Sequence, residues 1–214
     1  MINLDIFCSS GLDDERFKKP FTIDGKSYAT NGNIIVEVPE QDGISHEIPI
    51  SHGRIINAFW PHEVATEFID VLGQVEWPET AECDVCRTFG YVVQCKECDG
   101  GGMMAFQSSR HEYHCECKEC RGHGDLPARK GAVGATPCQL CDALGRYIKA
   151  GGDSSRIFPE LCGIHPGVKL AYSLLLKIKQ LPNPLLGKVK GLHDPVPFIF
   201  TGGRGAVMPM RGNI

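Results

Sequence analysis

The stretch CKECDGGG, residues 95–102, recurs almost unchanged as CKECRGHG at 117–124. Two looser copies flank it, CDVCRTFG at 83–90 and CQLCDALG at 138–145. Each copy is an eight-residue word in which Cys-x-x-Cys is followed by a turn that ends in glycine. Two thiolates three positions apart can reach one ion while the backbone turns beneath them, and glycine permits the left-handed conformations that such a turn needs. The words therefore predict eight metal ligands, enough for two tetrahedral sites.

The metal expected at these sites is zinc. Soft thiolates that leave no open coordination position are typical of structural zinc sites. Iron–sulfur ligation is the rival for four cysteines, but evenly repeated Cys-x-x-Cys words favour paired zinc knuckles. The segment that contains the words is rich in glycine and poor in large aliphatic side chains. We therefore expect metal binding, with a free energy of about 10 to 16 kcal/mol per site, to replace a hydrophobic core.

The words themselves indicate which pairs share an ion, although four knuckles can be matched in three ways. The two inner words share CKEC and the full glycine pattern, whereas the outer two have Thr88 and Ala143 in place of the middle glycine. Pairing like with like predicts two nested sites, the inner one on a hairpin whose arms include YVVQ and EYH. Site 1 then consists of Cys83, Cys86, Cys138 and Cys141, and site 2 of Cys95, Cys98, Cys117 and Cys120. Because eight cysteines satisfy two ions, we do not expect His114, Cys115 or His123 to be ligands.

Four such words across residues 83–145 resemble the cysteine-rich domain of DnaJ-type chaperones. The resemblance implies two bound Zn²⁺ ions and the pairing found in that family, first word with fourth and second with third. The chain differs from the family at the two missing middle glycines. It also has no His-Pro-Asp helical module and no Gly/Phe linker before the cysteine words.

The flanks, residues 1–79 and 151–214, predict an α+β body into which residues 80–150 are inserted as a double zinc finger. At 21–38, Asn31-Gly32 lies between two strand-like runs and predicts a hairpin. VPFIFTGG and GAVMPM in the tail predict a second hairpin. Apolar side chains at helical spacing predict helices over 62–72 and 167–181 that cover an antiparallel sheet made from both chain ends. In the second helix we expect Leu174, Leu175 and Ile178 to face inward and Lys177 to face outward.

The ending FTGGRGAVMPMR, residues 200–211, resembles the C-terminal strand of bacterial sliding clamps, and DGKSYATNG resembles a clamp hairpin. The resemblance implies one clamp-like domain. In clamps, the helices line a basic hole for DNA. As a whole, the chain is similar to small uncharacterised phage proteins that combine these flanks with a DnaJ-like insertion.

Charge is distributed unevenly along the chain. Residues 1–79 hold 5 Lys/Arg and 14 Asp/Glu, residues 80–150 hold nine of each, and residues 151–214 hold 8 and 3. A basic C-terminal third suggests contact with phosphates. The candidate nucleic-acid contacts are Lys169, Lys177, Lys179, Lys188, Lys190, Arg204 and Arg211.

Function is expected to be non-catalytic, because no nucleophile–base arrangement, phosphate-binding loop or dinucleotide fingerprint is present in the sequence. The N-terminal residues lack a signal-peptide pattern and no apolar run reaches membrane-spanning length, so we expect a cytoplasmic protein with no membrane partner. The favoured hypothesis is a zinc-binding adaptor that engages a partner protein, in phage or bacterial DNA metabolism. The alternative is a nucleic-acid-binding protein that uses the basic C-terminal third and the finger.

Overall fold

The computed structural model describes residues 1–214 except 10–16, 46–55, 58, 61–66, 149–163 and 211–214. The chain divides into two compact units: unit 1 comprises Met1–Glu79 and Ile148–Ile214, and unit 2 comprises Thr80–Tyr147. Unit 2 is therefore an insertion in the sequence of unit 1. The fold is α+β, with mostly antiparallel sheet and one described α-helix of two turns. A further strand-like run in the sequence, EIPIS at 47–51, lies outside the described residues.

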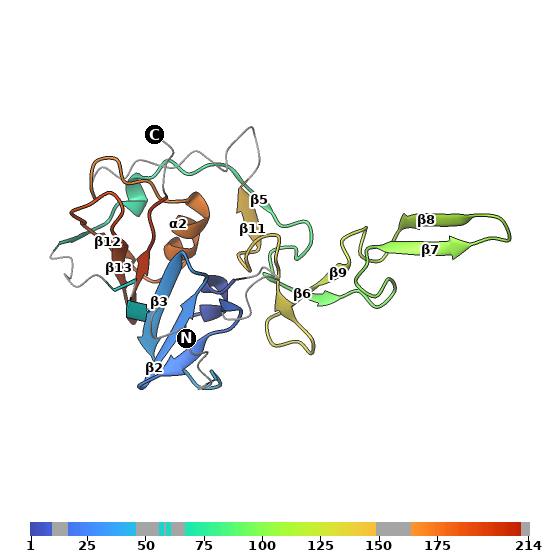
Figure 1. The fold of residues 1–214 in the computed structure, drawn as a ribbon, viewed down its shortest axis with the longest axis horizontal. Coiled ribbons are helices and arrows are strands. Elements are labelled where there is room, and N and C mark those ends of the chain that lie inside the picture. The colour runs from blue at the N-terminus through green and yellow to red at the C-terminus, as the bar shows by residue number, and fades with distance from the viewer. Residues whose placement is uncertain (10–16, 46–55, 58, 61–66, 149–163, 211–214) are drawn as a thin grey trace. The chain divides into compact units, whose positions relative to one another are not determined.

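Unit 1 is built on a seven-stranded antiparallel sheet in the order β1-β2-β3-β14-β13-β12-β4. The N-terminal half supplies β1 (Phe21–Ile23), β2 (Lys26–Thr30), β3 (Ile34–Pro39) and β4 (Phe68–Ile69). The C-terminal half supplies β12 (Leu185–Gly187), β13 (Val196–Phe200) and β14 (Gly203–Val207). Pairing of β3 with β14 joins the two ends of the chain, as Figure 1 shows for the blue and red strands. The prediction of one antiparallel sheet from both chain ends is confirmed.

Both predicted hairpins are present. In the first, the Asn31 side chain accepts hydrogen bonds from the backbone N–H groups of Asn33 and Ile34 and so fixes the turn between β2 and β3. A further turn at Asp24-Gly25, with φ of 49° and 71°, separates β1 from β2. The strand-like run before Asn31 predicts one strand, although Asp-Gly is itself a signal for the turn type with two positive φ angles.

The helix predicted over 62–72 is wrong in its described part. Phe68 and Ile69 form the edge strand β4, which pairs with β12, and Leu72–Gln74 form a short 3-10 helix, η3. The amphipathic spacing is real, since Val71 and Leu72 are buried and Glu67 is exposed. Pairing with β12 nevertheless makes Phe68 and Ile69 a strand, because Phe and Ile suit a strand as well as a helix. Residues 61–66 lie outside the described residues.

The helix predicted over 167–181 is shorter than expected. The α-helix α2 spans Tyr172–Lys179, and its N-cap residue Ala171 is extended. The preceding segment is held by a different contact, in which the Met210 N–H donates to the Lys169 carbonyl. Leu174, Leu175 and Ile178 face inward as predicted. Lys177 was expected to be exposed, but its side chain is fully buried, because the inward face of α2 is wide enough to include it.

The centre of the sheet is covered on both faces. Every residue from Ile34 to Val38 is buried, including Glu37. Close packing also explains a glycine in β14, since a Cβ at Gly205 would lie 2.1 Å from the Phe198 ring. The 3-10 helix η1 (Leu4–Phe7) contributes further apolar side chains that contact β2 and β3. The hairpin turn and the close packing of β14 therefore explain the glycines of GGRG at 202–205.

Glu37 is the one carboxylate among the buried polar residues described in unit 1, and the two strands that flank β3 in the sheet, β2 and β14, supply its partners. It accepts a hydrogen bond from Lys26 Nζ at 2.8 Å, two from Arg204 at 2.9 and 3.0 Å, and one from the Tyr28 hydroxyl at 3.3 Å. Burial opposes ionisation, but the bonds from Arg204 and Lys26 outweigh it and hold the pKa of Glu37 below its usual value. The guanidinium of Arg204 also lies over the Trp60 ring, 4.4 Å from its centroid. This cluster links β2, β3 and β14.

The Glu37→Gln substitution should lower the free energy of unfolding at neutral pH by about 1.5 to 3 kcal/mol, because it removes charge-assisted hydrogen bonds from a buried site. The folded pKa is below the unfolded one, so this stabilisation is present above the unfolded pKa and is lost as the pH falls through the folded pKa. The free energies of unfolding of the native protein and the variant, measured with urea, should therefore become equal in acid. A difference that stays constant from pH 7 to pH 3 would contradict this role.

Unit 2 contains three small sheets. A three-stranded sheet has the order β10-β6-β9, with β10 (Thr136–Pro137), β6 (Tyr91–Gln94) and β9 (Asp125–Ala128). β7 (Met103–Gln107) pairs with β8 (Glu112–Glu116), and β5 (Thr80–Glu82) pairs with β11 (Arg146–Ile148). The predicted hairpin with YVVQ and EYH as arms is therefore wrong: YVVQ is β6 and pairs with β9 and β10, whereas EYH lies in β8 and pairs with β7.

Among the helices in the described residues, none combines the length and the apolar character that crossing a lipid bilayer requires.

Candidate metal centres

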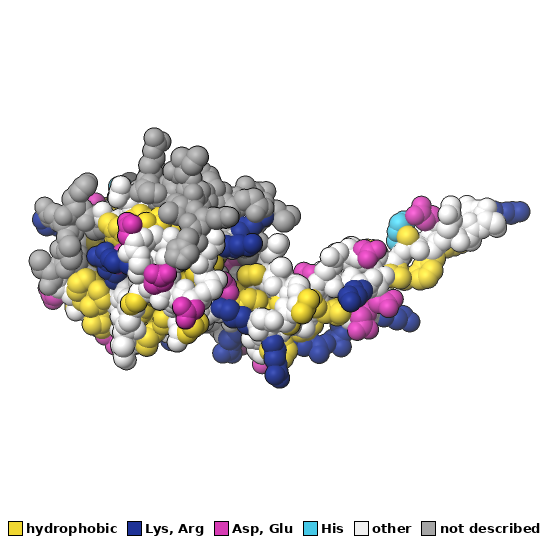
Figure 2. All heavy atoms as spheres, turned by 90° about the horizontal axis from the view of Figure 1, so that it is seen from below, with side chains coloured by type: hydrophobic (Ala, Val, Ile, Leu, Met, Phe, Trp, Pro, Cys, Tyr) yellow, Lys and Arg dark blue, Asp and Glu magenta, His cyan; other side chains and the backbone are white. Residues whose placement is uncertain are grey.

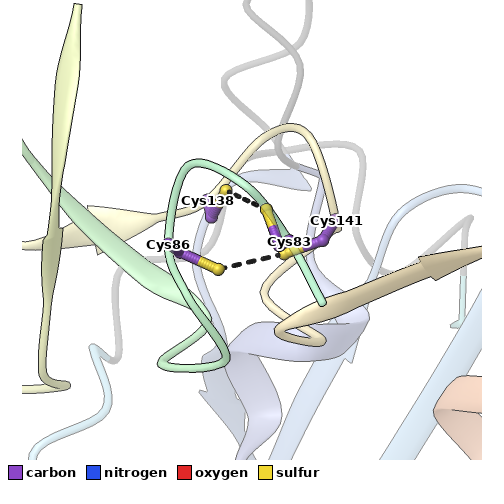
Figure 3. Close-up of side chains that lie close together, drawn as sticks. All are labelled: Cys83, Cys86, Cys138 and Cys141. Carbon is purple, nitrogen blue, oxygen red and sulfur yellow. Dashed lines mark hydrogen bonds between the residues drawn. The ribbon is translucent and has the colours of Figure 1, made fainter. Parts of the chain in front are cut away.

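The eight cysteines of the four words gather into two clusters of four thiols. Within each cluster the four Sγ atoms all lie within 4.8 Å of one another. Figure 3 shows the first cluster, where the two knuckles bring their sulfur atoms together from opposite sides. The first cluster is Cys83, Cys86, Cys138 and Cys141, and the second is Cys95, Cys98, Cys117 and Cys120. The structure thus brings together the sets that pairing like words predicted.

The sulfur–sulfur distances fit a shared ion and exclude disulfides. In the first cluster, Sγ of Cys83 lies 3.7 Å from that of Cys138, and Sγ of Cys86 lies 3.5 Å from that of Cys141. The corresponding distances between words in the second cluster are 3.9 and 3.6 Å. A disulfide requires about 2.05 Å. A tetrahedron with metal–sulfur bonds of about 2.3 Å has edges of about 3.8 Å, so each cluster can hold one metal ion.

Each knuckle has the same backbone course after its second cysteine. The next two residues have positive φ in all four words, for example 48° and 79° at Asp99 and Gly100. Thr88 and Ala143, which replace the middle glycine, adopt φ of 75° and 59° although each carries a Cβ. The turn is therefore set by the knuckle as a whole, and the missing glycines of the outer words do not change it.

The glycine that ends each word is where two knuckles meet. A Cβ on Gly102 would lie 2.2 Å from the carbonyl oxygen of Gly122, and one on Gly124 would lie 2.2 Å from that of Gly100. In the same way, a Cβ on Gly90 would lie 2.3 Å from the carbonyl oxygen of Ala143, and one on Gly145 would lie 2.3 Å from that of Thr88. Each of these glycines also accepts, at its carbonyl, the N–H of the first cysteine of the opposite word. The bonds are Cys83 to Gly145, Cys95 to Gly124, Cys117 to Gly102 and Cys138 to Gly90, at 2.8 to 3.0 Å.

Backbone N–H groups also point at the sulfur atoms. Cys98, Cys120 and Cys141 each accept a hydrogen bond at Sγ, from Gly102, Gly124 and Gly145 respectively, at 3.2 Å. Such bonds stabilise a thiolate and orient it toward the centre of the cluster. The word-ending glycine thus serves its own cysteine through its N–H and the opposite word through its carbonyl.

The electrostatics of each thiol cluster favours a cation bound among the four sulfur atoms. Burial raises the pKa of Cys86 to about 11 and that of Cys98 to about 12. A hydrogen bond from Cys141 lowers the pKa of Cys138 to about 5, because in the metal-free cluster one thiol can donate to another. Four buried thiolates repel one another, and only a bound cation lets all of them lose their protons.

The residues that the sequence set aside as ligands lie away from both clusters. His114, Cys115 and His123 are exposed, and His114 lies 3.6 Å from the carboxylate of Glu112. None of them belongs to a described group that can hold a metal ion.

The candidate nucleic-acid contacts do not form one basic surface in the described residues. Lys177 is buried, which removes it from contact with a ligand. Lys188 pairs with Glu67 at 2.9 Å, Arg204 is bound to Glu37, and Lys179 lies 4.0 Å from the centroid of the Trp77 ring. The remaining candidates are Lys169 and Lys190, which are exposed, and Arg211, which lies outside the described residues.

Sequence reasoning did not find Glu37 or its cluster with Lys26 and Arg204. One acidic residue within the apolar run IIVEV, residues 34–38, is a weak signal, because its partners are Lys26 in β2 and Arg204 in β14, the latter 167 residues away along the chain. Comparison of the chain with protein-family models, with curated proteins and with solved structures finds no significant match.

Gly102→Ala should destroy the second cluster, since the new methyl group would collide with the Gly122 carbonyl at a position whose φ is +72°. We expect bound metal to fall from two equivalents to one. Gly131→Ala is the matched control, because Gly131 also has a positive φ, +84°, but has no atom within 4 Å of its Cβ position. Elemental analysis after gel filtration gives the readout. Two equivalents in Gly102→Ala would show that the close approach is not needed.

Removal of metal should unfold unit 2 and leave the sheet of unit 1 intact. The two buried clusters in unit 2 consist mainly of the cysteines themselves, so little apolar burial remains without an ion. A chelator, or acid that protonates the thiolates, should remove the chemical-shift dispersion of the amide signals of Thr80–Tyr147 in an NMR spectrum. The signals of β2, β3 and β14 should keep their dispersion. Retention of both sets of signals in the metal-free protein would contradict this.

Proposed function

We propose that the protein is a non-catalytic zinc-binding adaptor in which two structural zinc ions fold unit 2, and unit 2 engages a partner protein. The observation that carries the proposal is the pair of closed four-thiol cages. In each cage cysteine sulfurs fill all four positions of a tetrahedron, so no position is left for water or substrate. An ion held in this way stabilises structure and does not act on a substrate.

The cage size supports zinc over an iron–sulfur cluster. The distances of 3.5 to 3.9 Å between words suit one ion at the centre of four sulfurs. A cluster interposes several iron and sulfide atoms between its cysteine ligands and requires a wider cage. The nested pairing is also the one that the resemblance to the DnaJ-type cysteine-rich domain implies.

The surface of unit 2 supports a protein partner. Most of the large hydrophobic side chains that are exposed in the described residues belong to this unit, although it is the smaller one. They are Phe89, Met103, Phe106, Tyr113, Val133 and Leu140. Contiguous exposed apolar side chains are typical of protein-binding surfaces, and Phe106 and Tyr113 lie opposite each other across β7 and β8. The likeness of the flanks to a sliding clamp suggests phage or bacterial DNA metabolism as the setting.

Electrostatics weighs against the nucleic-acid alternative. Each zinc with four thiolates carries a net charge of −2, which makes unit 2 more acidic than its formal charge. Phosphate binding favours the opposite sign. In unit 1, three of the candidate cations are buried or already paired with carboxylates.

Affinity capture from the native host tests the adaptor function. The zinc-loaded chain should retain a specific protein, and the Cys117→Ser/Cys120→Ser variant, which lacks the second cage, should lose it. A matched Cys8→Ser variant changes a buried thiol outside both cages and should behave like the native chain. Retention by the cage variant would place the binding surface in unit 1. A salt-dependent shift of labelled DNA at low protein concentration would favour the alternative function.

A further inference from the structure

The hairpin β7–β8 is a two-stranded ribbon to which no other described strand is added. Figure 1 shows it as the pale green pair of arrows in unit 2. Nearly all of its residues are exposed, and only Met104 is partly buried, against the cysteines of the second cluster. Both edges of the ribbon are therefore open to another strand.

The two faces of the ribbon differ in polarity. The register sets Met104 opposite Cys115 and Phe106 opposite Tyr113, and opposite residues share a face. We call these four side chains the apolar face. Phe106 and Tyr113 are 54% and 57% exposed. Figure 2 shows hydrophobic side chains along one side of this ribbon and histidine and acidic side chains on the other.

The hydrogen-bond pattern shows which backbone groups point outward. The Ser108 N–H donates to the His111 carbonyl, and the Cys117 N–H donates to the Gly102 carbonyl. Because bonded and non-bonded pairs alternate in an antiparallel ladder, Met104 and Phe106 bond across to β8. The N–H and C=O groups of Met103, Ala105 and Gln107 therefore face the open edge of β7. On β8 the outward residues are Glu112, His114 and Glu116.

The two edges also differ in charge. β7 reads MMAFQ and has no charged residue, whereas β8 reads EYHCE and has a glutamate at each end. Charged side chains on an edge strand oppose pairing with another chain, and an uncharged, apolar edge invites it. The edge of β7 is thus the one that accepts a further strand.

We propose that β7 pairs antiparallel with β7 of a second copy of this chain, about a two-fold axis at Ala105. The two Ala105 residues then exchange backbone hydrogen bonds, and the small side chain allows close approach. Met104 of one copy lies opposite Phe106 of the other, where sulfur and ring make a favourable contact. A two-fold pairing of β8 about His114 would instead set Glu112 opposite Glu116 twice.

The pairing would join two ribbons into one four-stranded sheet whose apolar face is doubled. A two-fold contact of this kind closes on itself and forms a dimer, not a fibre. Five-residue strands bury less than the roughly 1,200 Å² of a standard stable interface, so the dimer should dissociate readily on dilution. This self-association goes beyond the adaptor function and requires only that the second cluster be folded.

Sedimentation equilibrium of the zinc-loaded full chain in reducing buffer tests the pairing. The native chain should show a reversible monomer–dimer equilibrium. Ala105→Lys and Ala105→Glu should each raise the dissociation constant at least about tenfold, because like charges meet at the axis. An equimolar mixture of the two variants should restore the dimer, since unlike charges then meet. This rescue also shows that both variants are folded.

His114→Lys is the matched control, because it adds the same charge on the opposite edge of the ribbon and should leave the dissociation constant unchanged. A native chain that remains monomeric at its highest soluble concentration would overturn the proposal, including when it binds an added extended peptide at β7. So would variants at Ala105 that still dimerise, or a mixture that does not. Any of these results leaves zinc content and partner capture unaffected, so the adaptor function stands or falls separately.

Discussion

Unit 2 depends on its two cages of four thiols, each of which can hold one metal ion. Its two buried clusters are made mainly of the ligands, and its strands are two to five residues long. Short strands without an apolar core cannot offset the conformational entropy of folding. On the proposed function, the free energy of metal binding takes the place of that core. The reciprocal contacts of the word-ending glycines fix how the paired knuckles meet.

Unit 1 is held together in a different way. The centre of its sheet is buried on both faces. β3, near the N-terminus, pairs with β14, near the C-terminus. Glu37 reinforces this junction, because its partners Lys26 and Arg204 come from the strands on either side of β3. In the inserted segment, β5 pairs with β11, so its two ends lie side by side.

The difference in how the two units are stabilised has consequences for function. A metal-folded unit can expose apolar side chains such as Phe106 and Tyr113, because it does not need them for a core. A unit of the same size without metal ions would need a larger apolar core to fold. The exposed ribbon and its uncharged edge are thus available for contacts with other chains, which is the basis of both the proposed adaptor function and the proposed pairing.

The sequence by itself determined the features that depend on local spacing. The four words gave the eight thiols and, through their glycine patterns, the two sets; Asn31-Gly32 gave a turn, and the tail gave a hairpin. Tertiary structure decided what depends on distant partners. Phe68 and Ile69 form a strand because β12 is there to pair with them, and Lys177 is buried because of how α2 packs. Likewise YVVQ pairs with β9 and β10, a choice among strands of similar propensity that no local pattern encodes.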